Sequence, residues 1–453
     1  MTAAAAGAGE LTTLSPEIVR LRAETSPDWL AQRRRAAWDA FESMPWPSSQ
    51  RDEDWRRTDI SGLRAERFLP LDDVDGGMAA SMAQAWDSAE PNAAFAMDAP
   101  NVGPAVSDAD ALLAQGVIIT TLEEAAALHP ELVQRALARV AIDESKFIAL
   151  WNALWRGGVF VYVPRGVEAL APAWIAHPAS GDERAVIPAT VVLLDDASSL
   201  TVVDAYASPP GPHELFSDAV TMLNIGRDAQ LDYILLQQWG ERVWHVATHR
   251  ATLEANARLH FFGATLGSHV QKSYWEALLD GAGSEADIAG VCFAEHDQHI
   301  DHQSLQAHRA RDTRSDLLLK VAVRDKARSV YSGLIDVAPE AVHADGYVQN
   351  RNLLLSEGAK ADSVPRLEIK ANDVRCGHGA TAGHIDEEQR FYFQSRAVRR
   401  ADADALIVRG FLDDIVKRVP HPGVAKLVAS LLDAEVSGLP QIGLAEAEAQ
   451  DED

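Results

Sequence analysis

From residue 158 to about residue 384 the chain reads as a succession of short apolar strands with no helical segment between them. The strands include ATVVLL, SLTVVDAY, AVTMLNI, QLDYILLQQ and VWHVATHRATL, and Asp, Gly, Ala or Asn separates each from the next. Similar turn sequences return at residues 196–200, 228–231, 256–259 and 326–330, the early copies about 30 residues apart. A strand repeat of this length predicts a solenoid, whose coils bury their apolar strands against one another.

A Greek-key sandwich is the competing all-β architecture, because it too is built from short strands and frequent turns. The solenoid accounts better for the turns. Each coil would place a small residue inward at the turn and then an apolar strand, whose alternate side chains stack on the next coil.

Helical periodicity frames the strands on both sides. Apolar residues at helical spacing predict a mainly helical N-terminal region over residues 15–157, before a core over residues 158–384. Asp386 is placed to cap a helix, and residues 385–440 predict a C-terminal helical region. The Ala/Gly-rich residues 1–14 predict a disordered tail, and the acidic residues 441–453 a solvated one.

Composition excludes several classes of partner. The 453 residues carry a formal net charge of −26 at pH 7, which argues against binding nucleic acid or an anionic membrane surface. No basic and apolar leader is evident, and no apolar run approaches the roughly 20 residues that span a bilayer. The two cysteines, Cys292 and Cys376, are too few for a disulfide framework. We therefore expect a cytoplasmic protein.

Cys376 and His378 lie where the strands give way to helices. On a strand, side chains two residues apart share one face at about 7 Å, so this thiol and imidazole could together hold a soft metal or an iron–sulfur cluster. A buried cysteine beside a hydrogen-bonded histidine fits the same spacing, because two ligands do not complete a site.

A second group, His296, His299 and His302, has the composition of a metal site. On a strand His296 and His302 face one way and His299 the other, so the three would not converge on one ion. We expect polar surface or interface residues here. The chain also lacks the phosphate-binding and hydrolase motifs that a nucleotide-hydrolysing or serine- or zinc-dependent enzyme would carry.

Residues 352–396 contain NLLLS, LEI, DVRCGHGAT and FYFQSR. This run resembles the signature of the SufB/SufD family, the scaffold subunits of the SUF iron–sulfur cluster assembly system, and within it the SufD type. Residues 45–59, with a proline followed by EDWRRTD, and residues 158–167, GVFVYVPRGV, resemble two further segments of the family. The resemblance implies a right-handed parallel β-helix flanked by helical regions.

The resemblance also implies a non-catalytic scaffold that pairs with a SufB-like subunit and a SufC-like ATPase. Nascent iron–sulfur clusters would form at the interface between the two scaffold subunits. His378 and Cys376 match the family's residues there, and His378 would share a metal with a ligand of the partner. No cofactor would stay bound to the chain alone. A transient cluster and a reduced flavin are options for the complex, and a homodimer is an option for the chain.

Two details refine this expectation. SufB carries a cysteine in a Q-C-D-S-L-L segment where this chain has Asn350, so the sulfur-accepting thiol is expected on the partner. The C-terminal helices of the family dock SufC, and the matching apolar residues, which could equally pack in the helical core, are Phe391, Phe411, Leu412 and Ile415. The alternatives are a carbohydrate-active β-helix lyase or hydrolase, which needs carboxylates clustered in a groove, and a SufB-type subunit.

Overall fold

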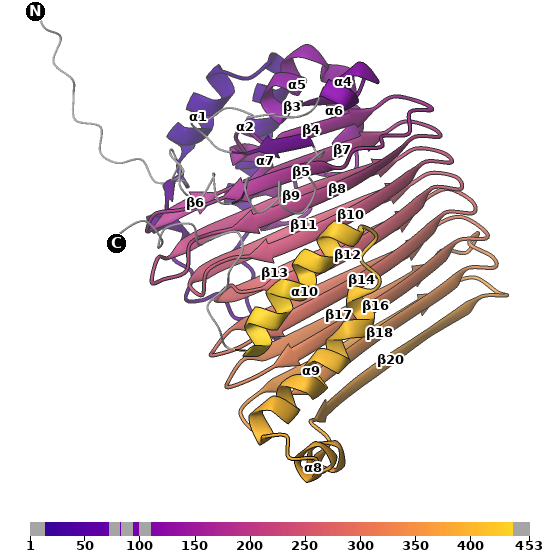
Figure 1. Cartoon of the computed structure of the whole chain (residues 1–453). Helices are drawn as coiled ribbons and strands as arrows, with labels where there is room; N and C mark the ends of the chain where they lie inside the picture. Colours follow the sequence, from indigo (N-terminus) through magenta and orange to yellow (C-terminus); the bar gives the residue numbers. More distant parts are fainter. Residues whose placement is uncertain (1–13, 72–81, 83–93, 99–109, 438–453) are drawn as a thin grey trace, which may run out of the picture.

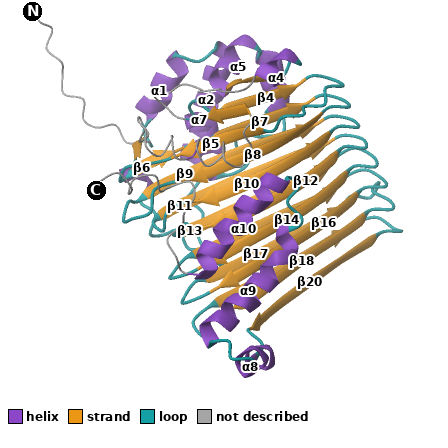
Figure 2. Cartoon of the chain, in the orientation of Figure 1, coloured by secondary structure: helices purple, strands orange, loops and turns teal. Residues whose placement is uncertain are grey.

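The computed structural model describes residues 14–71, 82, 94–98 and 110–437. Two long sheets form the body of the molecule, with the N-terminal helices at one end and the two long C-terminal helices across the face of one sheet (Figures 1 and 2). The expected tails lie outside the described residues except for Leu14, and so does much of the segment between residues 72 and 109. None of the helices in the described segments combines the length and apolar character that crossing a membrane requires.

The strands alternate between two sheets, which we call sheet A and sheet B. Sheet A runs in the order β3 (Ile118–Thr121), β4 (Val159–Val163), β7 (Ala189–Leu194), β9 (Leu215–Ile225), β11 (Val243–Leu253), β13 (Val270–Leu279), β15 (His299–His308), β17 (Arg328–Val337) and β19 (Lys360–Ile369), with β6 (Arg184–Val186) and β1 (Leu69–Pro70) beside it. Sheet B runs in the order β2 (Ala94–Met97), β5 (Ala173–Pro178), β8 (Ser199–Ala207), β10 (Gln230–Gln238), β12 (Arg258–Leu266), β14 (Glu285–Ala294), β16 (Arg314–Val323), β18 (Asp345–Leu354) and β20 (Arg375–His384).

Neighbouring strands in each sheet are parallel, with the antiparallel pair β3 and β4 as the exception among the described ladders. A parallel neighbour can be reached only by crossing to the other sheet and back. The chain therefore winds as a β-solenoid of about eight coils, which confirms the predicted solenoid. The Greek-key sandwich is wrong, because its strands would be mainly antiparallel.

The turns explain the repeat seen in the sequence. Asp228 and Asn256 stand at equivalent turns with φ of 58° and 57°, in the left-handed region that Asn and Asp tolerate best among residues with a side chain. The next residues, Ala229 and Ala257, are buried at 1% and 0% exposure. The predicted small inward residue at each turn is therefore confirmed at these two coils.

Large side chains fill the interior where neighbouring strands leave room. Trp275 of β13 is 2% exposed and lies against Gly263 of β12 and Gly290 of β14. A Cβ atom at Gly263 or Gly290 would come within 2.6 Å or 2.5 Å of the indole ring. The two glycines therefore make the space that the tryptophan occupies.

The N-terminal region caps the first coils and covers the outer face of sheet A with an aromatic-rich core. Trp151 and Trp155 are fully buried in it. Two of its strands, β2 and β3, begin the two sheets, so the region closes this end of the solenoid as well as covering it. Its helices are α1 (Pro16–Glu24), α2 (Asp28–Ser43), α4 (Asp110–Ala114), α5 (Leu122–Leu128), α6 (Pro130–Ala136) and α7 (Lys146–Leu154), with the short 3-10 turns η1 (Glu53–Trp55) and η2 (Ala65–Arg67).

Three helices follow the last strand: α8 (Glu387–Ser395), α9 (Arg400–Val416) and α10 (Pro422–Ser437). The side chain of Asp386 accepts a hydrogen bond from the amide of Glu388, so the predicted cap of the first helix is confirmed. Helices α9 and α10 lie across the outer face of sheet B, the yellow helices in front of the strands in Figure 1. Lys320 of β16 fixes α9 there by donating to the carbonyl of Phe411 and pairing with Asp414.

Candidate functional site: the open end of the solenoid

The last coil consists of β19 and β20, which stand at the free edges of sheets A and B. Each is ten residues long, and within the described part of the chain no strand pairs with its outer edge. Figure 1 shows β20 as the last strand of its sheet, at the end opposite the N-terminal helices. Native proteins usually protect long edge strands, because the free backbone groups of such strands recruit other strands.

Cys376 and His378 both lie on β20, as the strand prediction required. Their register partners on β18 are Gly346 and Val348. A Cβ atom at Gly346 would meet Ile335 and the imidazole of His308, two buried groups of the interior, so this row of side chains points inward. Since no further coil covers them, Cys376 is half-buried and His378 is exposed.

The thiol of Cys376 is less accessible than the imidazole of His378. Burial raises the pKa of the Cys376 thiol, although a backbone hydrogen bond from Gly346 partly opposes this. The thiol is therefore protonated near neutral pH and is a poor nucleophile as it stands. His378 presents an imidazole to solvent at the same rim, so it is the more accessible of the two side chains.

Asn350 lies one coil further in, beside Ala380 of β20. It is 1% exposed, and its carbonyl oxygen accepts hydrogen bonds from Ser363 and Asn352. Asn352 also donates to the carbonyl of Thr381 on β20, at 3.1 Å. Position 350, which the family resemblance singled out, therefore holds an amide whose oxygen is fully hydrogen-bonded just beneath the rim, and no thiol.

The rest of the rim is apolar and partly exposed. Leu367 and Ile369 of β19 are 36% and 41% exposed, and their partners Ile335 and Val337 one coil further in are fully buried. On the outer face of sheet B, Tyr347 is 41% exposed and lies across Gly377 and Gly379 of β20. Leu367 and Ile369 thus continue buried rows of the preceding coil but end in solvent at this one.

The three histidines do not converge. His299 faces outward to Thr58, with Nε2 3.0 Å from the hydroxyl, whereas His302 faces inward to Thr265 at 3.1 Å, so the predicted opposition of these two residues is confirmed. His296 is not on a strand: it occupies a turn with φ of 55°. His302 is 1% exposed, so the expectation of a surface residue is wrong for it.

His296 does come close to two carboxylates. One ligand atom each from Glu241, Glu295 and His296 lies within 4.8 Å of the others. Glu295 is already paired with Arg324, and His296 and Glu241 are more than half exposed. This is a solvated group of surface charges on neighbouring turns.

The four apolar residues proposed to meet an ATPase differ in exposure. Phe391 of α8 is 71% exposed, together with Tyr392 at 57%. Leu412 and Ile415 are buried at 2% and 0%, and Phe411 packs partly against the same core. Core packing therefore accounts for Leu412 and Ile415, which leaves Phe391 as the one accessible member of the set.

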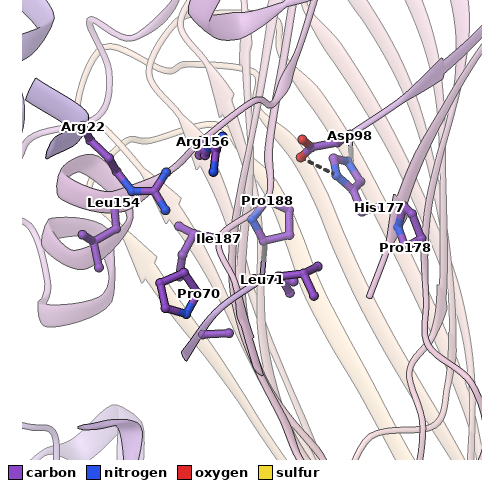
Figure 3. A pocket seen from close by; sticks show the side chains of 12 residues that line it. Arg22, Pro70, Leu71, Asp98, Leu154, Arg156, His177, Pro178, Ile187 and Pro188 are labelled. Atoms are coloured by element: carbon purple, nitrogen blue, oxygen red, sulfur yellow. Dashed lines mark hydrogen bonds and ion pairs between the residues drawn. The ribbon is translucent and has the colours of Figure 1, made fainter. Parts of the chain in front are cut away.

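At the closed end, the structure contains a network of buried charged side chains that the sequence did not predict. Asp204 of β8 is fully buried and bonded to His177 of β5 at 2.9 Å and to the hydroxyl of Tyr233 at 2.6 Å. The other imidazole nitrogen lies 3.1 Å from Asp98, which follows β2, at the side of a small cavity (Figure 3). Burial alone would lower the pKa of His177, but Asp204 and Asp98 raise it to about 9.

Sequence reasoning missed this network because its members are far apart along the chain and meet only through the coil register. Each of them alone reads as an ordinary polar residue on an apolar strand. The cavity beside His177 is about 40 Å³ and also has Arg22 and Arg156 in its wall. It is too small for more than a water or two, so the network is structural.

The chain matches two protein-family descriptions and several individual proteins. Residues 177–411 match the family described as "SUF system FeS cluster assembly, SufBD core domain", and residues 10–173 match "SufBD protein N-terminal region". An "Iron-sulfur cluster assembly SufBD family protein" of Staphylococcus epidermidis is 25% identical over 307 residues, 68% of this chain and 66% of that protein. The "Iron-sulfur cluster assembly protein SufB" of Bacillus subtilis is 25% identical over 310 residues, 68% of this chain and 67% of that protein.

The chain thus spans about two thirds of the length of these relatives. The core match covers the solenoid from β5 through β20 and extends into α9, and the N-terminal match covers the region that closes its first coils. Fold and sequence agree, and the chain belongs to the SufBD family of iron–sulfur cluster assembly proteins.

Proposed function

We propose that this chain is the SufD-type subunit of an iron–sulfur cluster assembly complex, and that its open end pairs with a SufB-like subunit. The observation that carries the proposal is the last coil. It presents two unpaired edge strands, an apolar rim and an accessible imidazole at one end of an otherwise closed solenoid. A second solenoid that ended in the same way would pair these strands and bury the rim.

The side chains available at that interface indicate what each of the two subunits would contribute to the site. This chain contributes His378 and a protonated Cys376 thiol at its rim, with the amide of Asn350 below them. An imidazole can share a soft metal or a nascent cluster with thiolates that come from the partner. Iron and sulfide are substrates here, and the few ligands on this chain suit a site completed by two subunits.

Co-purification tests the pairing. We expect the tagged chain, expressed with the SufB-like and SufC-like proteins of its source, to retain both. Leu367→Glu should abolish retention of the SufB-like subunit without unfolding the chain, because this rim leucine is already partly exposed. Leu170→Glu is the matched control, since Leu170 is 90% exposed and far from the rim in sequence. If both variants retain the partner, or if the wild-type chain purifies as a homodimer, the open end is not the proposed interface.

The role of His378 is tested inside the complex. His378→Ala should leave the complex assembled but should remove most cluster formation, followed by the visible absorbance of the cluster after iron and sulfide are supplied. His384→Ala is the control, because His384 is also exposed and lies on the same strand. Equal cluster formation in the two variants would exclude His378 as a ligand.

A SufB-type role is the second candidate, because one relative is itself named SufB. The two roles differ in which chain accepts sulfur. With isotopically labelled sulfur from a cysteine desulfurase, a SufB-type subunit would carry the label on Cys376, whereas a SufD-type subunit would leave it on the partner. The absence of a thiol at Asn350 and the protonated state of Cys376 favour the second outcome.

Docking of a SufC-like ATPase is assigned to the exposed face of the C-terminal helices. Phe391, Tyr392 and Leu406 are the large apolar residues that remain exposed there. Phe391→Ala should weaken retention of the ATPase, whereas Leu128→Ala in α5, which is 65% exposed, should not. Retention of the ATPase by both variants would move the docking site elsewhere.

A further inference from the structure

Residues 52–58 run from the N-terminal region across the outer face of sheet A, and we call this segment the strap. It contains η1 and the residues EDWRRT, to which the sequence alone assigned no chemistry. Thr58 contacts β15, and Asp54 contacts both β13 and β19. The strap therefore connects the closed end of the molecule with the strand at its open edge.

A buried ion pair lies under the strap. Lys272 of β13 and Asp301 of β15 are both completely buried, with Nζ 2.6 Å from Oδ2. Burying two charges is costly unless their remaining hydrogen-bonding groups find partners. The strap supplies two of these partners: the carbonyl of Asp54 accepts from Nζ at 2.7 Å, and the hydroxyl of Thr58 donates to Asp301.

The contact between the strap and sheet A is polar around Lys272 and Asp301, whereas the N-terminal helices cover the sheet with apolar side chains. The ring of Trp55 lies over Nζ at 4.9 Å and stacks on Phe147, which belongs to the N-terminal region itself. If the strap lifts, water can solvate Lys272 and Asp301 in its place. The strap is therefore held partly by polar contacts and partly by Trp55, which is 7% exposed and belongs to the aromatic core of the N-terminal region.

The far side of the strap touches the open edge. The carboxylate of Asp54 is 3.5 Å from the guanidinium of Arg366 on β19, and Arg366 also donates to Ser332 of β17 at 3.4 Å. A cavity of about 30 Å³ separates the strap from the outer faces of β15, β17 and β19, and its wall includes Glu53 and Val364. Among the strands that the structure describes, β19 has a neighbour on one side alone, so this exposed ion pair is a contact that holds β19 from outside the sheet.

We propose that the strap braces the edge strand β19, so that release of the strap loosens the open end and a partner that orders β19 also holds the strap in place. Coupling of this kind is reciprocal, because each event shifts the other by the same factor. The brace itself is a property of the isolated chain. Its effect on a partner rests on the proposed function.

Hydrogen exchange followed by mass spectrometry on the full chain tests the brace. Lys272→Met removes the cation that holds the strap. We expect amide exchange at least about tenfold faster in residues 52–58 and about two- to fivefold faster in β19 (Lys360–Ile369), because the ion pair that links the two is exposed. Thr58→Val is the milder second variant, should Lys272→Met fail to fold. Arg366→Met removes the contact between β19 and the strap, so it should speed exchange in both by a similar factor.

Lys320→Met is the matched control. Lys320 is also a lysine on the outer face of a strand, 3% exposed, with Asp414 as its ion-pair partner and the ring of Phe411 at 4.7 Å. It should loosen α9 and leave residues 52–58 and β19 unchanged. Faster exchange in the strap without any change in β19 would overturn the brace, as would an equal effect of Lys320→Met on β19. A chain that shows the coupled exchange but binds no SufB-like subunit would refute the proposed function and leave the brace standing.

Discussion

Replacement of His177 by glutamine tests whether a buried imidazolium holds the first coils together. In the folded chain Asp204 and Asp98 raise the pKa of His177 to about 9 from an ordinary value of 6.5. The residue is 2% exposed, so solvent screens the interaction little. A rise of the pKa from 6.5 to about 9 corresponds to about 3 kcal/mol of folding free energy.

The sign follows from the direction of the shift. Because the folded pKa lies above the unfolded one, this stabilisation is fully present below about pH 6.5 and is lost as the pH rises through about 9. Asp204 contributes the opposite arm: its pKa is lowered, mainly by His177 against the effect of burial, so its stabilisation is lost as the pH falls below the ordinary value of 3.8. The network therefore stabilises the fold most between these limits.

Urea unfolding at about pH 6 and about pH 9.5 measures the effect. We expect His177→Gln to reduce the unfolding free energy by about 3 kcal/mol more at the lower pH than at the higher one. His260→Gln is the control, because His260 pairs with Asp232 at 2.8 Å but is 45% exposed, and the difference should stay below about 1 kcal/mol. A destabilisation by His177→Gln that is the same at both pH values would refute the buried imidazolium.

Two further results are expected. Gly263→Ala should destabilise the chain by about 1–3 kcal/mol, because the new methyl group would meet the Trp275 ring at 2.6 Å, whereas Gly383→Ala, with no atom within 4 Å of the new Cβ, should be neutral in thermal unfolding. Ellman's reagent should modify the half-buried Cys376 of the native chain, and Cys292, which is fully buried, only after unfolding. Two fast-reacting thiols in the native chain would contradict the assigned position of Cys292 in the interior.

The repeat in the sequence was sufficient to predict the solenoid, because its signal is local. Each coil must turn with a left-handed residue such as Asn256 and then bury a small one such as Ala257, and both are visible in the sequence. The change from strand to helix at Asp386 was predictable for the same reason, since a helix cap is a property of a few adjacent residues. The paired placement of Cys376 and His378 on one strand face followed from the period of two.

Contacts between coils and between regions were not predictable in this way. Lys272 and Asp301 meet because β13 and β15 are neighbours in sheet A, and they are 29 residues apart in sequence. Asp204 and His177 meet through the register of β8 against β5. A single sequence does not show which coil lies in which register, so buried charges on its strands appear as isolated exceptions.

The last coil stays exposed although the chain continues beyond it. Three described helices follow β20 directly, yet α9 and α10 lie on the outer face of sheet B, where Lys320 and Arg418 bind α9 and the turn after it to the strands. At the other end, by contrast, β3 and the N-terminal helices close the first coils. The outer row of β19 carries alternating charges such as Asp362, Arg366 and Glu368, a common protection of edge strands against non-specific pairing. These charges and the proposed bracing by the strap would both keep this edge available for the partner that we propose.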